Sequence, residues 1–334
     1  MRIISMFNHK GGVGKTTTLF NCAIEMGRLG KRVLMVDLDA QANLTAVSIS
    51  ETALDELYRD GSPSMTVADA LAPLVSGSGD ILDPGAISIR SNHVWLLAGD
   101  IRLSQFEGIM PQGWTEALAG NERGFRVTTA PLRMIEQVAD NLDVDYVLVD
   151  LGPNVGPLNR AVLLASDYIM IPMSADLFSL RALPSVGASL TTWIKQWSTA
   201  LTVAPTVTFN LPEGKPKVLG HVSQQFGIYN GTPTKSFRQW IDKIPKVVED
   251  GLLIPLDAFS DSSGTPLSAV VRAHGSSMGV LKNYHSLVPY AQTQRKAIFE
   301  LEKDSVIFGQ QFDRAKATED DFKELCEQIF MRAT

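Results

Sequence analysis

The sequence has only two cysteines, Cys22 and Cys326, which are far apart in the sequence. Two isolated cysteines form no zinc motif, disulfide framework or iron–sulfur ligand set, and they suit a reducing compartment. The five histidines also form no close pair or catalytic motif. No apolar run approaches the ~20 residues that a membrane-spanning helix requires. We therefore expect a soluble, cytoplasmic protein whose chemistry depends on other residue types.

Charge and composition narrow the class of protein further. The formal net charge is -6, so the chain as a whole is not a polycation that coats nucleic acid. The chain has 334 residues, of which 45% are hydrophobic, so it can bury a large core. The first apolar run leads directly into a glycine-rich segment, which leaves no room for a signal peptide.

That glycine-rich segment, KGGVGKTT at residues 10–17, is the most informative feature. An apolar run at 3–7 precedes it and a helical apolar pattern follows from Thr16, so the order is strand, glycine turn, helix. In a phosphate-binding loop of this order, backbone N–H groups contact phosphate, a lysine neutralises it and a hydroxyl binds magnesium. The segment departs from the usual G-x-x-x-x-G-K-[ST] pattern, because His9 replaces the first glycine and Lys10 adds a second cation.

Two acidic clusters follow predicted strands. Asp37 and Asp39 lie in DLDAQAN, and Asp150 begins DLGPN. The carboxyl ends of parallel strands meet at one edge of a sheet, so we expect both clusters to face the loop. An aspartate at the end of an apolar strand is the usual residue that holds magnesium in nucleoside triphosphatases. Helix capping or turn formation is the alternative for Asp37 and Asp150.

Short apolar strands alternate with helical segments along the chain. The pattern predicts strands at 3–7, 32–37, 94–98, 146–150, 168–173 and 218–222. It predicts helices at about 16–29, 130–141, 157–166, 179–197 and 286–301. These patterns indicate an α/β fold with a mostly parallel central sheet and helices on both faces. We expect one domain over 1–334, an insertion at about 50–130 with loops at 61–85 and 108–124, and a C-terminal helical segment at about 286–330.

Three segments, KGGVGKTTT, DLDAQAN and DYVLVDLGPN, resemble the ParA/MinD group of deviant Walker A ATPases, and most closely the Soj-like ParA partition proteins. Lys10 matches the signature lysine of that group. The sequence departs from the family at Ala40 and Ala42, where Pro and Gly are usual, and at Gly152, where a second proline is common. These departures concern the stiffness of the loops and leave the charged residues in place.

The resemblance implies a P-loop NTPase fold with ATP and Mg2+ as cofactors. It implies that Asp39 lies at the metal and orients the attacking water, while Asp150 holds the metal through water. The expected nucleotide-binding residues are Gly11, Gly12, Val13, Gly14, Lys15, Thr16 and Thr17, with Thr16 also a magnesium ligand.

The resemblance further implies a division of labour between the two lysines. Lys15 would grip the β- and γ-phosphates, while Lys10 would cross a two-fold axis to the ATP of a partner subunit. The catalytic set is then Lys10, Lys15 and Asp39. The segment Gly152, Pro153 and Asn154 would form a second switch that senses the γ-phosphate.

The expected function is an ATP-dependent homodimer with weak, partner-stimulated ATP hydrolysis. The expected partners are nonspecific DNA and an activating protein of the ParB kind, in plasmid or chromosome partition and possible association with the bacterial nucleoid. Two basic sets are candidates for DNA contacts, and Tyr229, Phe237 and Trp240 interleave with the first. The sets are Lys215, Lys217, Lys235, Arg238, Lys243 and Lys246, and then Arg272, Lys282, Arg295, Lys296 and Lys303. An ordinary solvated surface is the alternative for both.

Other functions remain open at this stage. The same ATP switch is compatible with positioning or regulating another protein, and the fold is compatible with an ATP-dependent synthetase, although no acid/base motif for a synthetase is present. Membrane attachment is disfavoured, because the C-terminal segment is acidic and anionic lipid repels it. No helix-turn-helix segment precedes the loop, so we do not expect promoter-specific DNA reading. Gln224, Gln225 and residues 254–256 are the candidates for adenine contacts.

Overall fold

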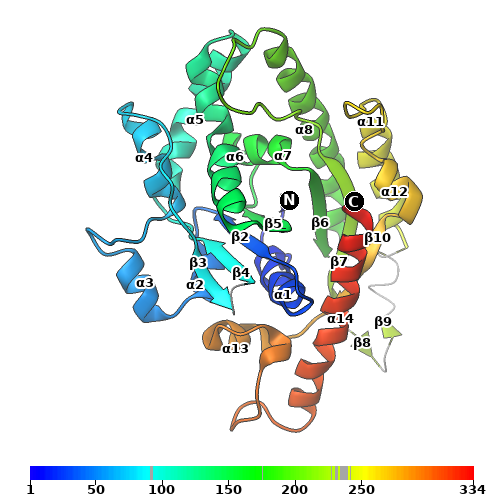
Figure 1. Ribbon diagram of the computed structural model, residues 1–334. Coiled ribbons are helices and arrows are strands. Elements are labelled where there is room, and N and C mark those ends of the chain that lie inside the picture. The colour runs from blue at the N-terminus through cyan, green and yellow to red at the C-terminus, as the bar shows by residue number, and fades with distance from the viewer. Residues whose placement is uncertain (91–92, 175, 227, 230–231, 234–239, 241) are drawn as a thin grey trace.

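The computed structural model describes residues 1–334 except 91–92, 175, 227, 230–231, 234–239 and 241. Its centre is an eight-stranded sheet in the order β10-β7-β6-β1-β5-β2-β4-β3 (Figure 1). The strands are β1 (Arg2–Met6), β2 (Val33–Leu38), β3 (Ile87–Arg90), β4 (Val94–Leu97), β5 (Tyr146–Leu151), β6 (Tyr168–Ser174), β7 (Lys217–Phe226) and β10 (Ser277–Lys282). Neighbouring strands pair in parallel, except that β3 is antiparallel to β4. A separate antiparallel pair joins β8 (Ile228–Tyr229) to β9 (Thr232–Pro233).

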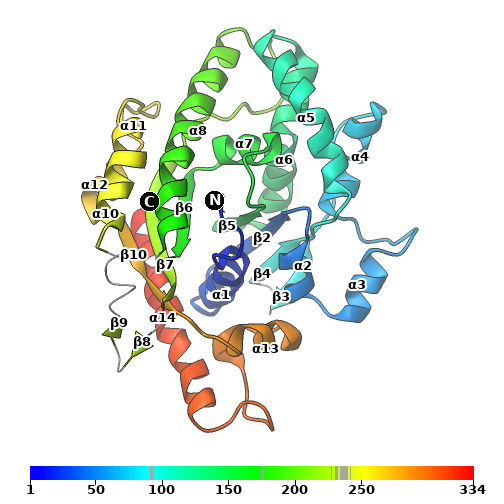
Figure 2. The ribbon, with the colours of Figure 1, turned by 180° about the vertical axis from the view of Figure 1, so that it is seen from behind.

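Helices cover both faces of the sheet (Figures 1 and 2). One core lies beneath α4 (Val67–Ser76), α5 (Leu103–Leu118), α6 (Glu122–Leu142), α7 (Pro157–Ala165), α8 (Leu177–Thr202), α10 (Ile244–Val248), α11 (Ile254–Leu256) and α12 (Ala269–His274). The other core lies beneath α1 (Lys15–Arg28), α2 (Asn43–Ser48), α3 (Glu51–Leu57), α13 (Leu287–Gln294) and α14 (Gln310–Arg332). A π-helical turn (Glu249–Leu253) and a 3-10 turn (Ile298–Glu300) complete the helical elements of the described residues.

The strands separate these two cores because their side chains alternate in direction. In β1, Ile3 packs into the first core and Ile4 into the second. The strands β2 and β6 are buried along their whole length, which explains why both read as continuous apolar runs. The predicted α/β class, with a mostly parallel sheet covered on both faces, is confirmed.

Two segments that the sequence predicts as loops contain helices instead. Within 61–85 lies α4, whose N-terminus is a capping box between Thr66 and Asp69. Within 108–124 lie most of α5 and the start of α6. Two glycines of the second segment serve close packing rather than turns: a Cβ at Gly113 would lie 2.7 Å from Val127, and one at Gly124 would lie 2.1 Å from the Ala117 nitrogen. The loop prediction was wrong because tertiary packing outweighs the low helix propensity of glycine.

The C-terminal part also differs from its prediction. The helix predicted at 286–301 ends at Gln294, because Arg295 adopts a left-handed conformation with φ of 50°. The acidic C-terminal segment forms α14, which lies along α1 in Figure 1 and buries Phe322, Leu325 and Ile329. Among the described residues, no helix is both long and apolar enough to cross a membrane.

Candidate nucleotide-binding site

The glycine-rich loop connects β1 to α1, as predicted. Gly12 and Gly14 have φ angles of 71° and 85°, in the left-handed region that side chains rarely adopt. A Cβ at Gly14 would also lie 2.2 Å from the Gln224 amide oxygen. These glycines let the backbone turn directly into α1, whose N-terminus carries unpaired N–H groups and the positive end of the helix dipole. The loop therefore has the backbone geometry of an anion site.

Lys15 lies inside this loop and is only 7% exposed. Its Nζ is 3.4 Å from the Asn8 carbonyl oxygen and 3.5 Å from the Lys10 carbonyl oxygen, both long for hydrogen bonds. Burial lowers the pKa of Lys15, and the nearby charges of Asp150 and Asp39 partly offset that effect. A buried ammonium group with such weak contacts is well suited to a phosphate oxygen.

Thr16 and Asp150 meet beside Lys15, which brings together two residues 134 positions apart. The Thr16 hydroxyl donates a 2.6 Å hydrogen bond to Asp150 Oδ2. The other carboxylate oxygen, Oδ1, is buried and has no partner among the described residues. Burial, followed by the charge of Asp37, raises the pKa of Asp150 to about 7.

This pair fits the magnesium role predicted for it. Magnesium keeps several waters and typically binds one or two protein groups plus substrate phosphates. The described residues contain no cluster of three His, Cys, Asp or Glu side chains able to hold a metal ion. A hydroxyl ligand from Thr16 and an outer carboxylate from Asp150, whose free oxygen needs a hydrogen-bond donor such as water, match that requirement. Magnesium bound there would neutralise charge on the phosphates.

Asp37 has a different role from Asp150, although the two are directly opposite in the register of β2 and β5. Asp37 Oδ2 accepts hydrogen bonds from the Thr45 backbone N–H at 2.8 Å and the Thr45 hydroxyl at 2.7 Å. Thr45 Oγ1 in turn accepts a bond from the Gly99 N–H at 2.7 Å. Burial raises the pKa of Asp37 to about 6. The turn-forming alternative therefore describes Asp37, which anchors the segment after β2.

Asp39 and the predicted second switch lie together. A Cβ at Gly152 would be 3.3 Å from Asp39 Oδ1 and 3.4 Å from Asn154 Nδ2. Asp39 Oδ1 also accepts a 3.0 Å hydrogen bond from the Gln41 N–H. Ala42 has a φ of 52°, which accounts for the family's use of glycine at this position.

Asn159 holds the backbone of the predicted second switch, and the sequence analysis did not identify this residue. This 2% exposed side chain on α7 donates 2.8 Å hydrogen bonds to the carbonyl oxygens of Gly152 and Asn154. Its sequence signal was a polar residue within an apolar helical run, which by itself does not show which backbone groups it binds.

Lys10 forms an ion pair that the sequence also did not reveal. Its ammonium group contacts the carboxylate of Asp176, and both side chains are about one-third exposed. Asp176 is the N-cap of α8, where its Oδ1 accepts a 2.8 Å hydrogen bond from the Ser179 N–H. Burial alone would raise the pKa of Asp176, but the hydrogen bonds from Lys10 and Ser179 lower it. Lys10 thus lies on the accessible side of the loop.

Of the candidate adenine residues, Gln224 lies at the loop and 254–256 lie away from it. The Gln224 side chain is buried and donates a 2.7 Å hydrogen bond to Thr18 Oγ1, so it supports the loop and α1. The side chain of Gln225 lies outside the described residues. The segment 254–256 forms α11, which packs on α8 in the core opposite α1.

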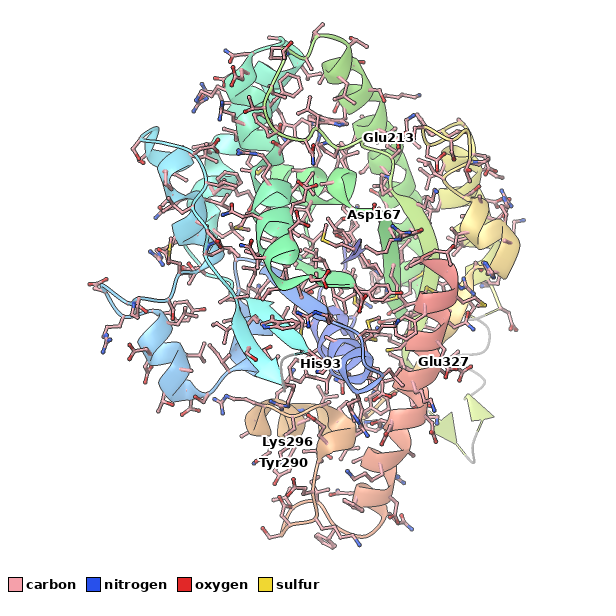
Figure 3. All side chains as sticks on the ribbon, in the orientation of Figure 1. His93, Asp167, Glu213, Tyr290, Lys296 and Glu327 are labelled. Atoms are coloured by element: carbon pink, nitrogen blue, oxygen red, sulfur yellow. The ribbon has the colours of Figure 1, made fainter. Side chains whose placement is uncertain are left out.

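The two predicted basic sets are largely neutralised by acidic neighbours. Lys217 pairs with Asp261 at 2.6 Å, and Lys296 pairs with Glu302 at 2.8 Å. Arg272 pairs with both Glu249 and Asp257 at 2.6 Å. Lys215 pairs with Glu213, and Figure 3 shows Glu213 and Lys296 in the upper and lower parts of the molecule. Most described cations of the two sets therefore pair with acidic residues, while Lys235, Arg238 and Phe237 lie outside the described residues.

Comparison with known proteins agrees with this geometry. A family model described as an AAA domain, AAA_31, matches residues 1–203. The chromosome-partitioning ATPase Soj of Thermus thermophilus is 30% identical over 190 residues, which cover 57% of this chain and 61% of Soj. The chain spans about half to three fifths of the length of the curated relatives it matches.

Solved structures agree with the fold. A protein from Corynebacterium diphtheriae is 25% identical with a TM-score of 0.67, covering 88% of this chain and 97% of that one. The septum site-determining protein MinD of Pyrococcus horikoshii, complexed with Mg-ADP, is 16% identical with a TM-score of 0.54, covering 98% of this chain and 95% of that one. The family model covers more than half of the chain and the loop geometry agrees with it, so the chain belongs to the AAA_31 family of AAA domains and to the ParA/MinD type of P-loop ATPases.

Proposed function

We propose that this protein is an ATP-dependent molecular switch that dimerises with ATP and Mg2+ bound and hydrolyses ATP slowly. The observation that carries this proposal is the meeting of Lys15 with the Thr16–Asp150 pair at the N-terminus of α1. Phosphoryl transfer to water depends mainly on holding the triphosphate, neutralising its charge and placing a water in line. The loop supplies the first two functions.

Asp39 is our candidate for placing the attacking water. It lies beside the second switch and close enough to Lys15 to affect the pKa of that lysine. A carboxylate at this position accepts a hydrogen bond from water and aims the oxygen of that water at the γ-phosphate. Asp150 lies deeper and acts on the metal side.

Lys10 is our candidate for the contact between subunits. Its ion pair with Asp176 is partly exposed, and such pairs are typically worth only ~0–1 kcal/mol. Exchanging Asp176 for the triphosphate of a partner subunit would therefore cost little. A cation supplied in this way acts like an arginine finger and is worth about 10³ or more in rate.

The proposed biological role is DNA partition, with nonspecific DNA as a partner of the ATP dimer and a ParB-like protein as its activator. The likeness to Soj supports this role. Lys243 and Lys246 are exposed and are our candidates for phosphate contacts. Binding of this kind weakens steeply as salt rises.

A second candidate role keeps the same switch and gives it a protein partner in place of DNA. The observation in its favour is that acidic residues pair with most described members of the two basic sets.

Size-exclusion chromatography with light scattering tests the switch and the partner together. We expect the 36.4 kDa monomer without nucleotide and with ADP, and twice that mass with ATP and Mg2+. Adding a DNA fragment of random sequence should shift only the ATP form, and the shift should disappear at high salt. One mass in all three nucleotide states would contradict the switch. An ATP-dependent dimer whose mass does not change when DNA is added would favour the protein-partner role.

A further inference from the structure

Glu107 lies on the second turn of α5, which approaches the second switch from a different part of the chain. Its side chain is partly buried. A Cβ built on Gly156 would lie 2.1 Å from Glu107 Oε1 and 2.7 Å from Asn154 Oδ1. The two oxygen atoms therefore surround one point next to the backbone of Gly156, and only a glycine leaves room for both.

The Asn154 side chain connects this point to Asp39. Asn154 Oδ1 accepts hydrogen bonds from the Gly156 N–H at 2.7 Å and from Asn159 Nδ2 at 3.2 Å. Its Nδ2 faces the other way, because it and Asp39 Oδ1 lie 3.4 and 3.3 Å from the position of a Cβ on Gly152. The amide group of Asn154 thus lies between two carboxylates, Glu107 on one side and Asp39 on the other.

We propose that Glu107 is a positioning residue for ATP hydrolysis, acting through Asn154 on Asp39. This inference rests on the proposed function and adds a residue to its machinery. Glu107 limits where the Asn154 amide can move, so that Nδ2 stays on the side of Asp39, next to the Gly152 backbone. Asp39 is then held in the orientation from which it aims water. Asn154 is itself exposed, so contact from α5 supplies a restraint that burial does not.

A purely structural role does not explain Glu107. Among the described residues it has no ion-pair partner, unlike Glu116 on the same helix, which pairs with Arg123 at 2.8 Å. Burial, followed by the charge of Asp39, raises the pKa of Glu107. A partly buried carboxylate next to another carboxylate disfavours the folded state, and groups of this kind concentrate at functional sites.

Steady-state ATPase kinetics of Glu107→Ala and Glu107→Gln test the proposal. Because small displacements of a catalytic group cost up to about 10²-fold in rate, we expect Glu107→Ala to lower kcat by about 10-fold. We expect KM for ATP and the affinity for ATP to stay within about twofold, because among the described residues no hydrogen bond or ion pair joins Glu107 to the loop. Glu107→Gln keeps the shape of the side chain and offers Asn154 Oδ1 an N–H donor in place of a carboxylate oxygen, so it should retain most of the activity. Gln105→Ala, at an exposed position two residues earlier on α5, is the matched control.

A double-mutant cycle separates positioning from a general loosening of the fold. Asn154→Ala should reproduce the loss of kcat, and adding Glu107→Ala to it should lower kcat no further. The melting temperature of Glu107→Gln should equal or exceed that of the wild type, because the variant removes repulsion from Asp39.

Normal kcat in Glu107→Ala, or multiplying effects in the double variant, would overturn the inference and leave the proposed function intact. A wild-type protein that neither binds nor hydrolyses ATP would overturn both.

Discussion

The nucleotide site has a buried half and an accessible half, and they differ in what they are built to contact. The buried half consists of Lys15 and Asp150 with the partly buried Thr16 between the loop and Asp150, and their polar groups contact one another or the loop itself. The accessible half includes Lys10 and Asp39, which lie near the surface. A site for ATP in one subunit needs only the first half. The second half is placed to contact a water molecule, a switch segment or a second subunit at the surface.

Removing Lys15 should break the buried half with the largest effect. We expect Lys15→Ala to weaken ATP binding by about 100-fold or more, since a charge-assisted contact to phosphate is worth roughly 3 kcal/mol in a site shielded from water. Isothermal titration calorimetry measures the change, and Lys246→Ala on the exposed surface of α10 is the control. Equal affinities for ATP in the two variants would contradict the assignment of Lys15.

Removing Lys10 should break the accessible half alone. We expect Lys10→Ala to bind ATP with near-normal affinity but to form no ATP-dependent dimer, and its turnover should fall by about 10³. Asp176→Asn is the informative partner variant, because asparagine keeps the N-cap of α8 and weakens the hold on Lys10. It should dimerise at lower protein concentration than the wild type, as followed by light scattering. Unchanged dimers in Lys10→Ala would refute the role between subunits.

The pH dependence of stability tests the buried part of the site. The pKa is raised to about 6 for Asp37 and to about 7 for Asp150, and both carboxylates are buried. Asp37 and Asp150 bind protons more tightly in the folded state than in the unfolded chain, where the pKa of Asp is about 3.9. The nucleotide-free protein should therefore lose stability as pH rises from about 4 to about 7.

Asp150→Asn should flatten that pH dependence and raise the free energy of unfolding at pH 8, at about 1.4 kcal/mol for each unit of the removed pKa shift. The affinity of the same variant for ATP should depend less on the magnesium concentration than that of the wild type. Chemical denaturation from pH 4 to 8 provides the measurement. A steeper loss of stability in Asp150→Asn than in the wild type would show that Asp150 is charged and favourably paired in the fold.

The smallest expected effect concerns Ala42, in the segment after Asp39. Its left-handed conformation costs roughly 1–2 kcal/mol, while glycine adds flexibility to the unfolded chain at about 0.4–1 kcal/mol. Ala42→Gly should therefore be neutral or stabilising by up to about 1 kcal/mol. Ala46→Gly, inside α2, should instead destabilise by about 1 kcal/mol. Thermal unfolding of both variants, side by side, checks the difference.

Much of this molecule was predictable from local patterns. The strands that carry the site are apolar runs buried on both faces, so β1, β2, β5 and β6 were found close to their observed bounds. Residues 10–17 were identified because a glycine turn between strand and helix has few other uses. The helix α5 and the start of α6 were missed, since Gly113 and Gly124 read as turn residues until their packing partners are known. The helix α4 was missed because Gly, Ser, Pro and Asp are frequent in the segment 61–85 around it.

The functional residues divide in the same way. Lys15, Thr16 and Asp150 were predicted from the glycine-rich loop and from the aspartate at a strand end, while the roles proposed for Lys10 and Asp39 came from the family resemblance. Asn159, Asp176 and Glu107 belong to no motif. Each lies next to a residue outside its own element. This proximity arises only when the fold places their helices beside the loop.

The sequence by itself determined the phosphate-binding loop, the acidic residues at the strand ends and the parallel sheet that carries them, because backbone turns and strand burial are imposed by neighbouring residues. Only the tertiary structure decided which carboxylate pairs with Thr16, which one anchors Thr45 and what restrains Lys10 and Asn154. Those outcomes depend on contacts between residues up to 166 positions apart, and on the desolvation that accompanies them.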